Sequence, residues 1–271
     1  MANKDSNNLY ILSAVIAVLA IVASGGGLLF PDLYQGNALL RAGWRGNDLV
    51  TLFVALPLFI ASIILAARGS LRGRLVWLGM LAYVVYNFAY YLFGAAFNRF
   101  FLLYVALVDL AMVALLFGLM QLDGVGMGRQ FRASTPARWI AAYMAFVAAG
   151  LTAVYGAMSL GFVVTGELPE IVTNTGHLTS IVFALDLTLV VPWFVMGAVL
   201  LWQRRAWGYV VATILNVKGA VYMVALSAVT VSAVMAGASE DLSQVGLWGF
   251  IGLGSLVASA LLLWNVEASA R

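Results

Sequence analysis

The chain has 271 residues, of which 64% are hydrophobic and only 9% are charged. A soluble domain is roughly 45–50% apolar and about 25% charged, so this composition excludes an ordinary soluble fold and indicates a membrane protein. The absence of cysteine excludes disulfides and thiolate chemistry, and a single histidine disfavours a transition-metal site, so we expect no cofactor. The net charge of +3 does not predict a nucleic-acid partner, because the basic residues gather at the ends of apolar runs.

Eight apolar segments follow one another along the chain, and each reaches the length of about 18 residues that identifies a membrane-spanning helix. The connections between them are short, and none is large enough for a separate soluble domain. The sequence therefore predicts an all-α fold, a polytopic membrane helix bundle in which residues 1–271 form a single membrane domain. The predicted spans are 9–30, 49–67, 75–97, 100–120, 139–163, 178–202, 207–236 and 244–265.

Lysine and arginine are distributed unevenly between the two ends of the predicted helices. If the spans alternate in direction, ten basic residues lie on one side and three on the other. The positive-inside rule then predicts that both termini are cytoplasmic, in a bacterial cytoplasmic membrane. An alternative for the first segment is a cleaved signal peptide with its cleavage site at residues 22–25. The ten are Lys4, Arg68, Arg72, Arg74, Arg129, Arg132, Arg138, Arg204, Arg205 and Arg271, and the three are Arg41, Arg45 and Arg99.

Basic side chains at the inner ends of helices also attract anionic lipid headgroups. We therefore expect membrane lipids as partners of the two arginine clusters that follow the second and sixth spans. These residues are Arg68, Arg72, Arg74, Arg204 and Arg205.

Two stretches of the chain share residues in the same order. Residues 48–74 and 186–205 each contain Asp-Leu, a threonine, a proline within the apolar run and basic residues at the inner end. Four helices per unit preserve the direction of the chain, so we predict a 4+4 parallel repeat. The alternative is that leucine-rich helices ending in arginine look alike without any duplication. In the helix after each stretch, the matched residues are Arg74, Asn87 and Tyr91 and, in the second unit, Arg205, Lys218 and Tyr222.

Three stretches read "AARGSLRGRLVWLGMLAYVVYN", "FNRFFLLYVAL" and "LLWQRRAWGYVVATILNVKGAVY". Together they resemble a family of uncharacterised multi-pass bacterial membrane proteins, over residues 37–226. The resemblance implies a multi-pass fold. It implies no activity and no catalytic residues.

Three ionisable residues lie well inside the apolar runs: Lys218, Asp109 and Asp186. Each costs roughly 2.5–3.5 kcal/mol at a helix centre, so such residues usually face protein or water and find partners. At about 1.5 Å per residue, Lys218 and Asp109 lie roughly 16 Å and 18 Å from the inner ends of their helices. Asp186 is deeper, within reach of a lysine side chain. We predict that one or both aspartates hold Lys218.

Polar and aromatic side chains of the third and seventh predicted helices surround this position. Tyr83, Tyr86, Asn87 and Tyr90 follow the spacing of one helix face, and Tyr222 lies one turn from Lys218. The predicted buried polar site therefore contains Lys218, Asp109, Asp186, Asn87, Tyr83, Tyr86, Tyr90 and Tyr222.

Several functions fit such a site. The first is a transporter-like or ligand-binding bundle that takes a small molecule or protons at the bilayer midplane. The second is a non-catalytic scaffold or accessory subunit, also as a homo-oligomer, whose buried ion pair only fixes helix packing. A chromophore bound to Lys218 is a third reading, but the third helix has no acidic counterion. An enzyme is disfavoured, because no metal motif, nucleophile elbow or cysteine is present.

Overall fold

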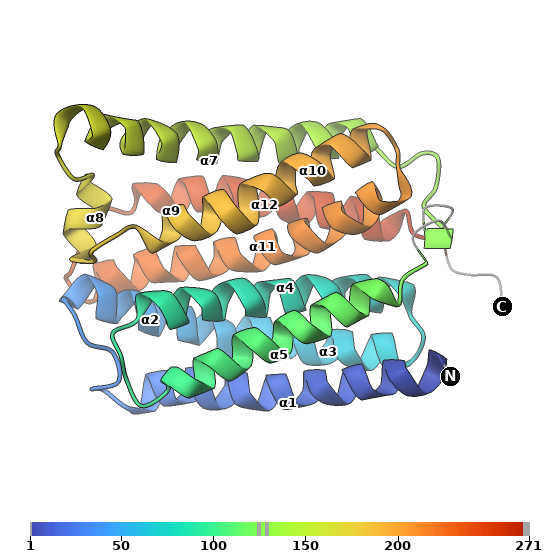
Figure 1. The fold of residues 1–271 in the computed structure, drawn as a ribbon, viewed down its shortest axis with the longest axis horizontal. Helices are drawn as coiled ribbons and strands as arrows, with labels where there is room; N and C mark the ends of the chain where they lie inside the picture. The colour runs from blue at the N-terminus through green and yellow to red at the C-terminus, as the bar shows by residue number, and fades with distance from the viewer. Residues whose placement is uncertain (1, 124–125, 128–129, 268–271) are drawn as a thin grey trace.

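A computed structural model gives the structure of residues 2–123, 126–127 and 130–267. Within these ranges, eight helices are long and apolar enough to cross a membrane, and they run side by side (Figure 1). The predicted all-α polytopic helix bundle is confirmed. Six of the spans are single helices: α1 (Ala2–Leu29), α4 (Leu71–Gly94), α5 (Phe101–Met120), α7 (Ala137–Thr165), α11 (Ala206–Met235) and α12 (Ser243–Trp264). A short helix, α8 (Glu170–Thr175), follows α7.

The remaining two spans are each built from three consecutive pieces. The second span consists of α2 (Ala38–Val50), η1 (Thr51–Ala55) and α3 (Leu56–Ala67). The sixth consists of α9 (Ile181–Leu185), η2 (Asp186–Val190) and α10 (Val191–Trp202). The middle piece of each is a π-helix, a turn that holds one residue more than the α-helix.

A proline explains each π-helix. Pro57 and Pro192 are each the second residue after the end of the π-helix. A proline has no N–H to donate, and its ring pushes away the carbonyl four residues earlier. In both spans, the residue directly after the π-helix donates its N–H to the carbonyl of the first π-helical residue, five positions earlier. The widened turn therefore absorbs the distortion that the two prolines cause.

The second span begins earlier than the sequence predicts, at Ala38 instead of residue 49. Its first turns contain Arg41, Arg45 and Asp48, which lower the hydropathy of the segment. The helix nevertheless forms because Asn37 caps it, accepting a hydrogen bond from the N–H of Leu40 at 2.9 Å. Both arginines are exposed and Asp48 is fully buried. The predicted span 49–67 left Asp48 in the connection before it, and this boundary is wrong, because Asp48 lies within the helix.

The two halves of the chain repeat the same series of elements. η1 and η2, α3 and α10, and α4 and α11 begin at positions that are 135 residues apart in each case. α4 and α11 pack against each other where the two halves meet, as Figure 1 shows between the blue-to-green and the yellow-to-red helices. This arrangement agrees with a 4+4 parallel repeat.

The turns that follow the two π-helix-containing spans each hold a residue with positive φ at the equivalent position. Gly69 has φ +82° and Arg204, 135 residues later, has φ +54°. The next residue in each half donates its N–H to the carbonyl five residues earlier, Ser70 to Leu65 at 3.0 Å and Arg205 to Leu200 at 2.9 Å. The two halves therefore match at a register that differs from the one predicted from Asp-Leu and from Asn87 and Lys218.

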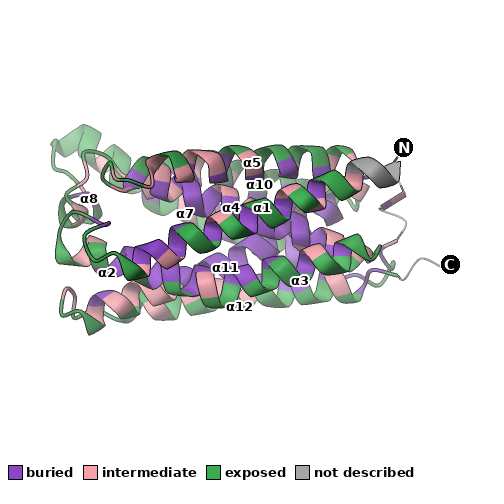
Figure 2. Cartoon of the chain, turned by 90° about the horizontal axis from the view of Figure 1, so that it is seen from below, coloured by how far each residue is buried: buried purple, intermediate pink, exposed green. Residues whose placement is uncertain are grey.

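The start of α1 and the end of α12 lie at the same end of the bundle, here named the terminal end (Figure 1). The turns between α3 and α4 and between α10 and α11 lie at this end too, and the opposite end is named the far end. Of the ten predicted inner basic residues, Arg129 and Arg271 lie outside the described residues. The core runs along the bundle axis, and α4 is buried over most of its length (Figure 2).

Candidate functional site

Lys218 projects from α11 into an aromatic cage in the protein interior. Its side chain is buried, with 6% of its surface exposed. The Nζ atom lies 3.5 Å from the centre of the Tyr86 ring and 4.8 Å from that of Tyr222. The two rings meet edge to face at 4.7 Å. A cation over an aromatic face is attracted by the negative charge of the ring face, most strongly when both are shielded from water.

The carboxylate next to this cage belongs to Asp186, the first residue of η2. Tyr86 and Tyr155 each donate a hydrogen bond from the hydroxyl group, to Asp186 Oδ1 and Oδ2 respectively, the second at 2.9 Å. Both carboxylate oxygens therefore have a donor. Tyr155 is held in place by Phe183, whose ring stacks on it at 4.3 Å.

Tyr86 connects the two charged groups. Its hydroxyl donates to Asp186, while the face of its ring lies against the ammonium group of Lys218. Among the described residues, Lys218 makes no hydrogen bond and no ion pair within 4.0 Å, and the ion pair found is between the exposed Arg132 and Glu267. The three N–H donors of the amine therefore remain available to a ligand or to water.

A second, uncharged polar network lies between α2–η1 and α4. Asn47 Nδ2 donates to Asn87 Oδ1 at 2.9 Å, and Asn87 Nδ2 approaches Thr51 Oγ1 at 3.4 Å. Thr51 Oγ1 is in turn 3.0 Å from the hydroxyl of Tyr83. All four side chains are buried.

The repeat relates this network to the charged site. Thr51 and Asp186 both begin a π-helix, and Tyr83 and Lys218 lie at the same distance from the starts of α4 and α11. The hydrogen-bonded pair Thr51 and Tyr83 is therefore the counterpart of Asp186 and Lys218. Only the second half carries charges at this position.

A third polar cluster lies closer to the far end of the bundle, around Asp48. Tyr34 donates to Asp48 Oδ2 at 2.6 Å and Tyr91 donates to Oδ1 at 2.8 Å. The ring of Trp44 stacks on Tyr34 at 5.8 Å and contacts Tyr91 at 4.7 Å. Burial, together with the carboxylate of Asp48, raises the pKa of Tyr34, so its hydroxyl stays protonated and able to donate.

The structure brings together only part of the predicted polar site. Lys218, Asp186, Tyr86 and Tyr222 lie in one cluster, although no ion pair within 4.0 Å joins Lys218 to Asp186. Asn87 and Tyr83 belong to the uncharged network instead, and Tyr90 packs on Trp44 at 4.5 Å.

Asp109 does not belong to the buried polar site in which the sequence analysis placed it. Its side chain is exposed on α5, a helix that packs against α1 and α4. The prediction used depth along the helix, which matched, but it had no information about the direction in which each side chain points. Asp109 therefore faces away from the core and does not reach the cluster of Lys218.

Sequence reasoning missed the partners that come from other helices. Tyr155 lies in a long apolar segment, and Tyr34 lies in a connection between spans. Neither tyrosine lies at helical spacing from a charged residue that would indicate a buried polar site. Asp48 had a signal, since it lies four residues after Trp44, on the same face of a helix, but Arg41 and Arg45 made this segment look like a connection between spans.

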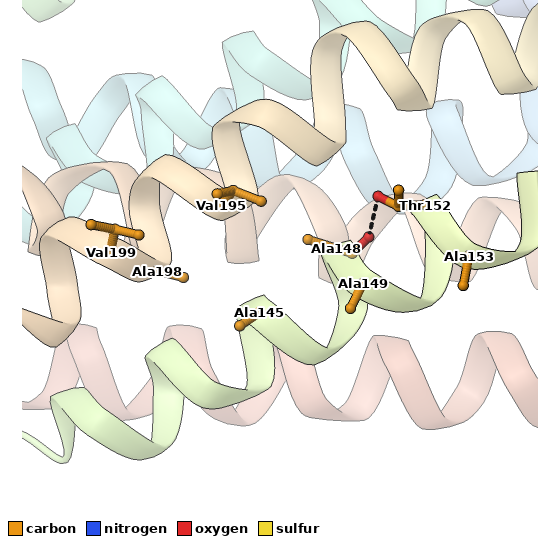
Figure 3. Close-up of a pocket in the computed structure, with 8 residues that line it drawn as sticks. All are labelled: Ala145, Ala148, Ala149, Thr152, Ala153, Val195, Ala198 and Val199. Carbon is orange, nitrogen blue, oxygen red and sulfur yellow. Dashed lines mark hydrogen bonds between the residues drawn. The ribbon is translucent and has the colours of Figure 1, made fainter. Parts of the chain in front are cut away.

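A surface groove of about 430 Å³ lies apart from these clusters, between α7 and α10 (Figure 3). Its only polar side chain is Thr152, whose hydroxyl donates to the carbonyl of Ala148 in its own helix at 2.8 Å. Most of its lining residues are exposed on the outside of the bundle. The lining consists of Ala145, Ala148, Ala149, Thr152, Ala153, Val195, Ala198 and Val199. The groove offers an apolar surface and no group for polar chemistry.

Comparison of the chain with protein-family models, with curated proteins and with solved structures found no match. The class of protein follows from the fold itself. Eight apolar helices of spanning length, a core of buried polar clusters and an apolar exterior define an integral, multi-pass membrane protein.

Proposed function

We propose that this protein is a transporter-like bundle that binds a small anionic ligand, or exchanges protons, at the buried site of Lys218 and Asp186. The observation that carries the proposal is the amine of Lys218. It is buried among tyrosines, and none of its three donors is used by a described residue. Ionisable groups within membrane spans are functional candidates because their insertion is costly.

The chemistry of the site supports an anion or a proton as the species that is bound. An ammonium group without an acceptor attracts a carboxylate or a similar anion, which would accept hydrogen bonds from Nζ. Asp186 accepts hydrogen bonds from two tyrosine hydroxyls and lies next to the lysine. A proton that leaves Lys218 would leave a neutral amine, and the affinity for an anion would fall with it. Protonation and ligand binding are therefore coupled in this proposal.

The repeat adds a second line of support. Alternating access in many transporters comes from two similar halves that move against each other around a site at their interface. Tyr86 belongs to α4 of the first half, while Lys218 and Asp186 belong to the second half. The site thus spans the interface of the two halves, where such a motion would open and close it.

A packing role is the second candidate, and one observation favours it. Both oxygens of Asp186 already have donors, so the cluster is nearly complete without a ligand. A buried polar network of this kind can fix the register of helices. In that case the two charges together could be removed without loss of any activity.

The experiment compares wild-type protein with Lys218→Met and with a matched control, Tyr83→Phe. Purified protein is tested in detergent for stabilisation by a panel of small carboxylates and inorganic anions, and in proteoliposomes for proton flux under an imposed pH gradient. We expect an anion or a proton flux that acts on the wild type and on Tyr83→Phe but not on Lys218→Met. Tyr83→Phe alters the counterpart position in the other half, so it controls for a general effect of changing a buried polar residue.

Undiminished anion binding or proton flux in a folded Lys218→Met variant would refute the proposed site. The double variant Lys218→Met with Asp186→Asn separates the two candidate functions. If it retains every measured activity, the charges serve packing only.

The orientation and location belong to the same proposal. The excess of basic residues at the terminal end supports cytoplasmic termini in a bacterial cytoplasmic membrane. Anionic lipids are the proposed partners of Arg68, Arg72, Arg74, Arg204 and Arg205. Arg72 and Arg204 each spend one donor on a backbone carbonyl, of Val266 and Ala133, and keep other donors for headgroups.

A further inference from the structure

The buried carboxyl group of Asp48 has no basic side chain as a partner among the described residues. Asp48 has no exposed surface, and no described lysine or arginine lies within 4.0 Å of it. An isolated carboxylate in a medium of low dielectric constant is strongly disfavoured unless a cation or a proton balances it. The two tyrosine hydroxyls that donate to Asp48 stabilise the ionised form but leave its charge uncompensated.

Two further hydroxyls beside this carboxylate make no hydrogen bond of regular geometry. Ser24 Oγ lies close enough to Asp48, and the hydroxyl of Tyr104 close enough to Tyr34, to interact electrostatically, but neither contact has the distance and angle of a hydrogen bond. Both residues are at most 1% exposed. Buried polar atoms without a partner are rare, and each one calls for an explanation such as a bound water or ion.

The backbone of α1 approaches the same point. A Cβ atom at Gly27 would collide with Asp48 Oδ2 and with the hydroxyl of Tyr34. The lack of a side chain at Gly27 thus lets the helix lie directly against the carboxylate. Side-chain oxygens from five segments converge here, namely from α1, the connection after it, α2 and the facing ends of α4 and α5.

We propose that this cluster is a binding site for a monovalent cation, Na⁺, with Asp48 as its anionic ligand. Hard cations prefer oxygen ligands, and the cluster offers the carboxylate and four hydroxyl groups and no nitrogen ligand. The ion would balance the charge of Asp48 and give Ser24 and Tyr104 the partner that they lack. The far end of the bundle lies less than one helical turn beyond Tyr91 and Tyr104, so the cluster is close to that end.

This site is separate from that of Lys218, and the proposal does not depend on the proposed function. The experiment measures the thermal stability of the purified protein in detergent, with NaCl titrated against choline chloride at constant ionic strength. It uses the wild type, Asp48→Asn, Ser24→Ala and a control, Ser62→Ala. Ser62 is also buried, but its hydroxyl donates to the carbonyl of Phe59 within its own helix.

We expect Na⁺, and not choline, to raise the melting temperature of the wild type and of Ser62→Ala with a saturating dose response. Asp48→Asn should abolish the response. Ser24→Ala should weaken the apparent affinity by about tenfold, the loss that corresponds to one polar contact. Because the Ser24 hydroxyl has no partner, this variant should fold as the wild type does even if Asp48→Asn does not.

An equal response to Na⁺ and choline in the wild type would overturn the proposal, and so would an unchanged Na⁺ affinity in Ser24→Ala. The titration is repeated between pH 5 and pH 9 in choline chloride. A stability that depends on pH through Asp48 and is indifferent to Na⁺ would show that a proton balances the carboxylate, which also overturns the assignment to Na⁺. Tyr34, Tyr91 and Tyr104 are the other titratable groups that face Asp48.

Discussion

Lys218 occupies, in the second half of the chain, the place that Tyr83 occupies in the first. Each lies twelve residues after the start of its helix, α11 or α4, and each faces the first residue of a π-helix in the preceding span. The two halves share a backbone plan, and the pairs Thr51–Tyr83 and Asp186–Lys218 carry different chemistry within it. The two charged residues occur in only one half of the repeat. They can therefore be mutated while the uncharged counterparts in the other half serve as a reference.

Removing Lys218 alone should destabilise the protein more than removing both charges. Lys218→Met leaves the buried carboxyl group of Asp186 without a cation near it, and removing one of two interacting buried charges costs up to about 3–5 kcal/mol. Asp186→Asn together with Lys218→Met removes the uncompensated charge and should cost clearly less than the sum of the two single changes. Reversible unfolding in mixed micelles gives the coupling energy. Strict additivity would mean that the two groups do not interact.

Gly27 and Gly25 should respond in opposite ways to alanine. A Cβ at Gly27 meets Asp48 and Tyr34, so Gly27→Ala should cost about 1–3 kcal/mol through overpacking. Nothing lies within 4 Å of a Cβ at Gly25, so Gly25→Ala should stabilise α1 by about 0.5–1 kcal/mol. Melting temperatures of the two variants, compared with the wild type, test both signs. A loss of stability in Gly25→Ala similar to that of Gly27→Ala would contradict the packing described for Asp48.

Arg204 has a left-handed backbone conformation that its counterpart, Gly69, adopts without cost. A non-glycine residue in this region is disfavoured by about 1–2 kcal/mol. Arg204→Gly should therefore stabilise the protein by about 1 kcal/mol, less the hydrogen bond from Arg204 to the carbonyl of Ala133. Gly69→Ala should destabilise it by a similar amount. Thermal unfolding of both variants provides the check, and a destabilised Arg204→Gly would show that the side-chain contact outweighs the strain.

Reporter fusions test the orientation. Because both termini lie at the terminal end, a fluorescent protein that matures only in the cytoplasm should be bright at either terminus. Alkaline phosphatase, which is active only outside the cytoplasm, should be active when inserted near Arg99, at the far end. The reverse pattern would place the basic residues outside and contradict the proposed orientation.

Most of the fold could be predicted from the sequence because the signal for a membrane span is strong and local. Seven of the eight predicted spans agree with the observed helices to within a few residues, apart from the extended start of α1. The exception is the second span, whose first turns are amphipathic. Their charged residues, Arg41, Arg45 and Asp48, lower the hydropathy of the segment, so the span was predicted to begin too late. Arginines can lie in the first turns of a membrane helix if they point outward, which hydropathy averaged over a window does not detect.

The site was harder to predict because it depends on direction as well as depth. Lys218, Asp186, Tyr86 and Tyr222 were expected together and lie together. Asp109 has a suitable depth but points outward from α5. The structural offset of 135 residues pairs Asp186 with Thr51, so matching Asp48 with Asp186 in the sequence pairs residues that are not equivalent in space.

Each half of the chain begins and ends at the same end of the bundle, so the connection from α5 to α7 stays on one side of the membrane. That connection could therefore be severed without requiring either fragment to reverse its insertion. Two separately synthesised polypeptides, each with four spans, would enter the bilayer in the same direction and could associate through α4 and α11. The single chain is thus arranged like two four-helix subunits of a heterodimer, of which only the second carries Lys218 and Asp186 at the equivalent positions.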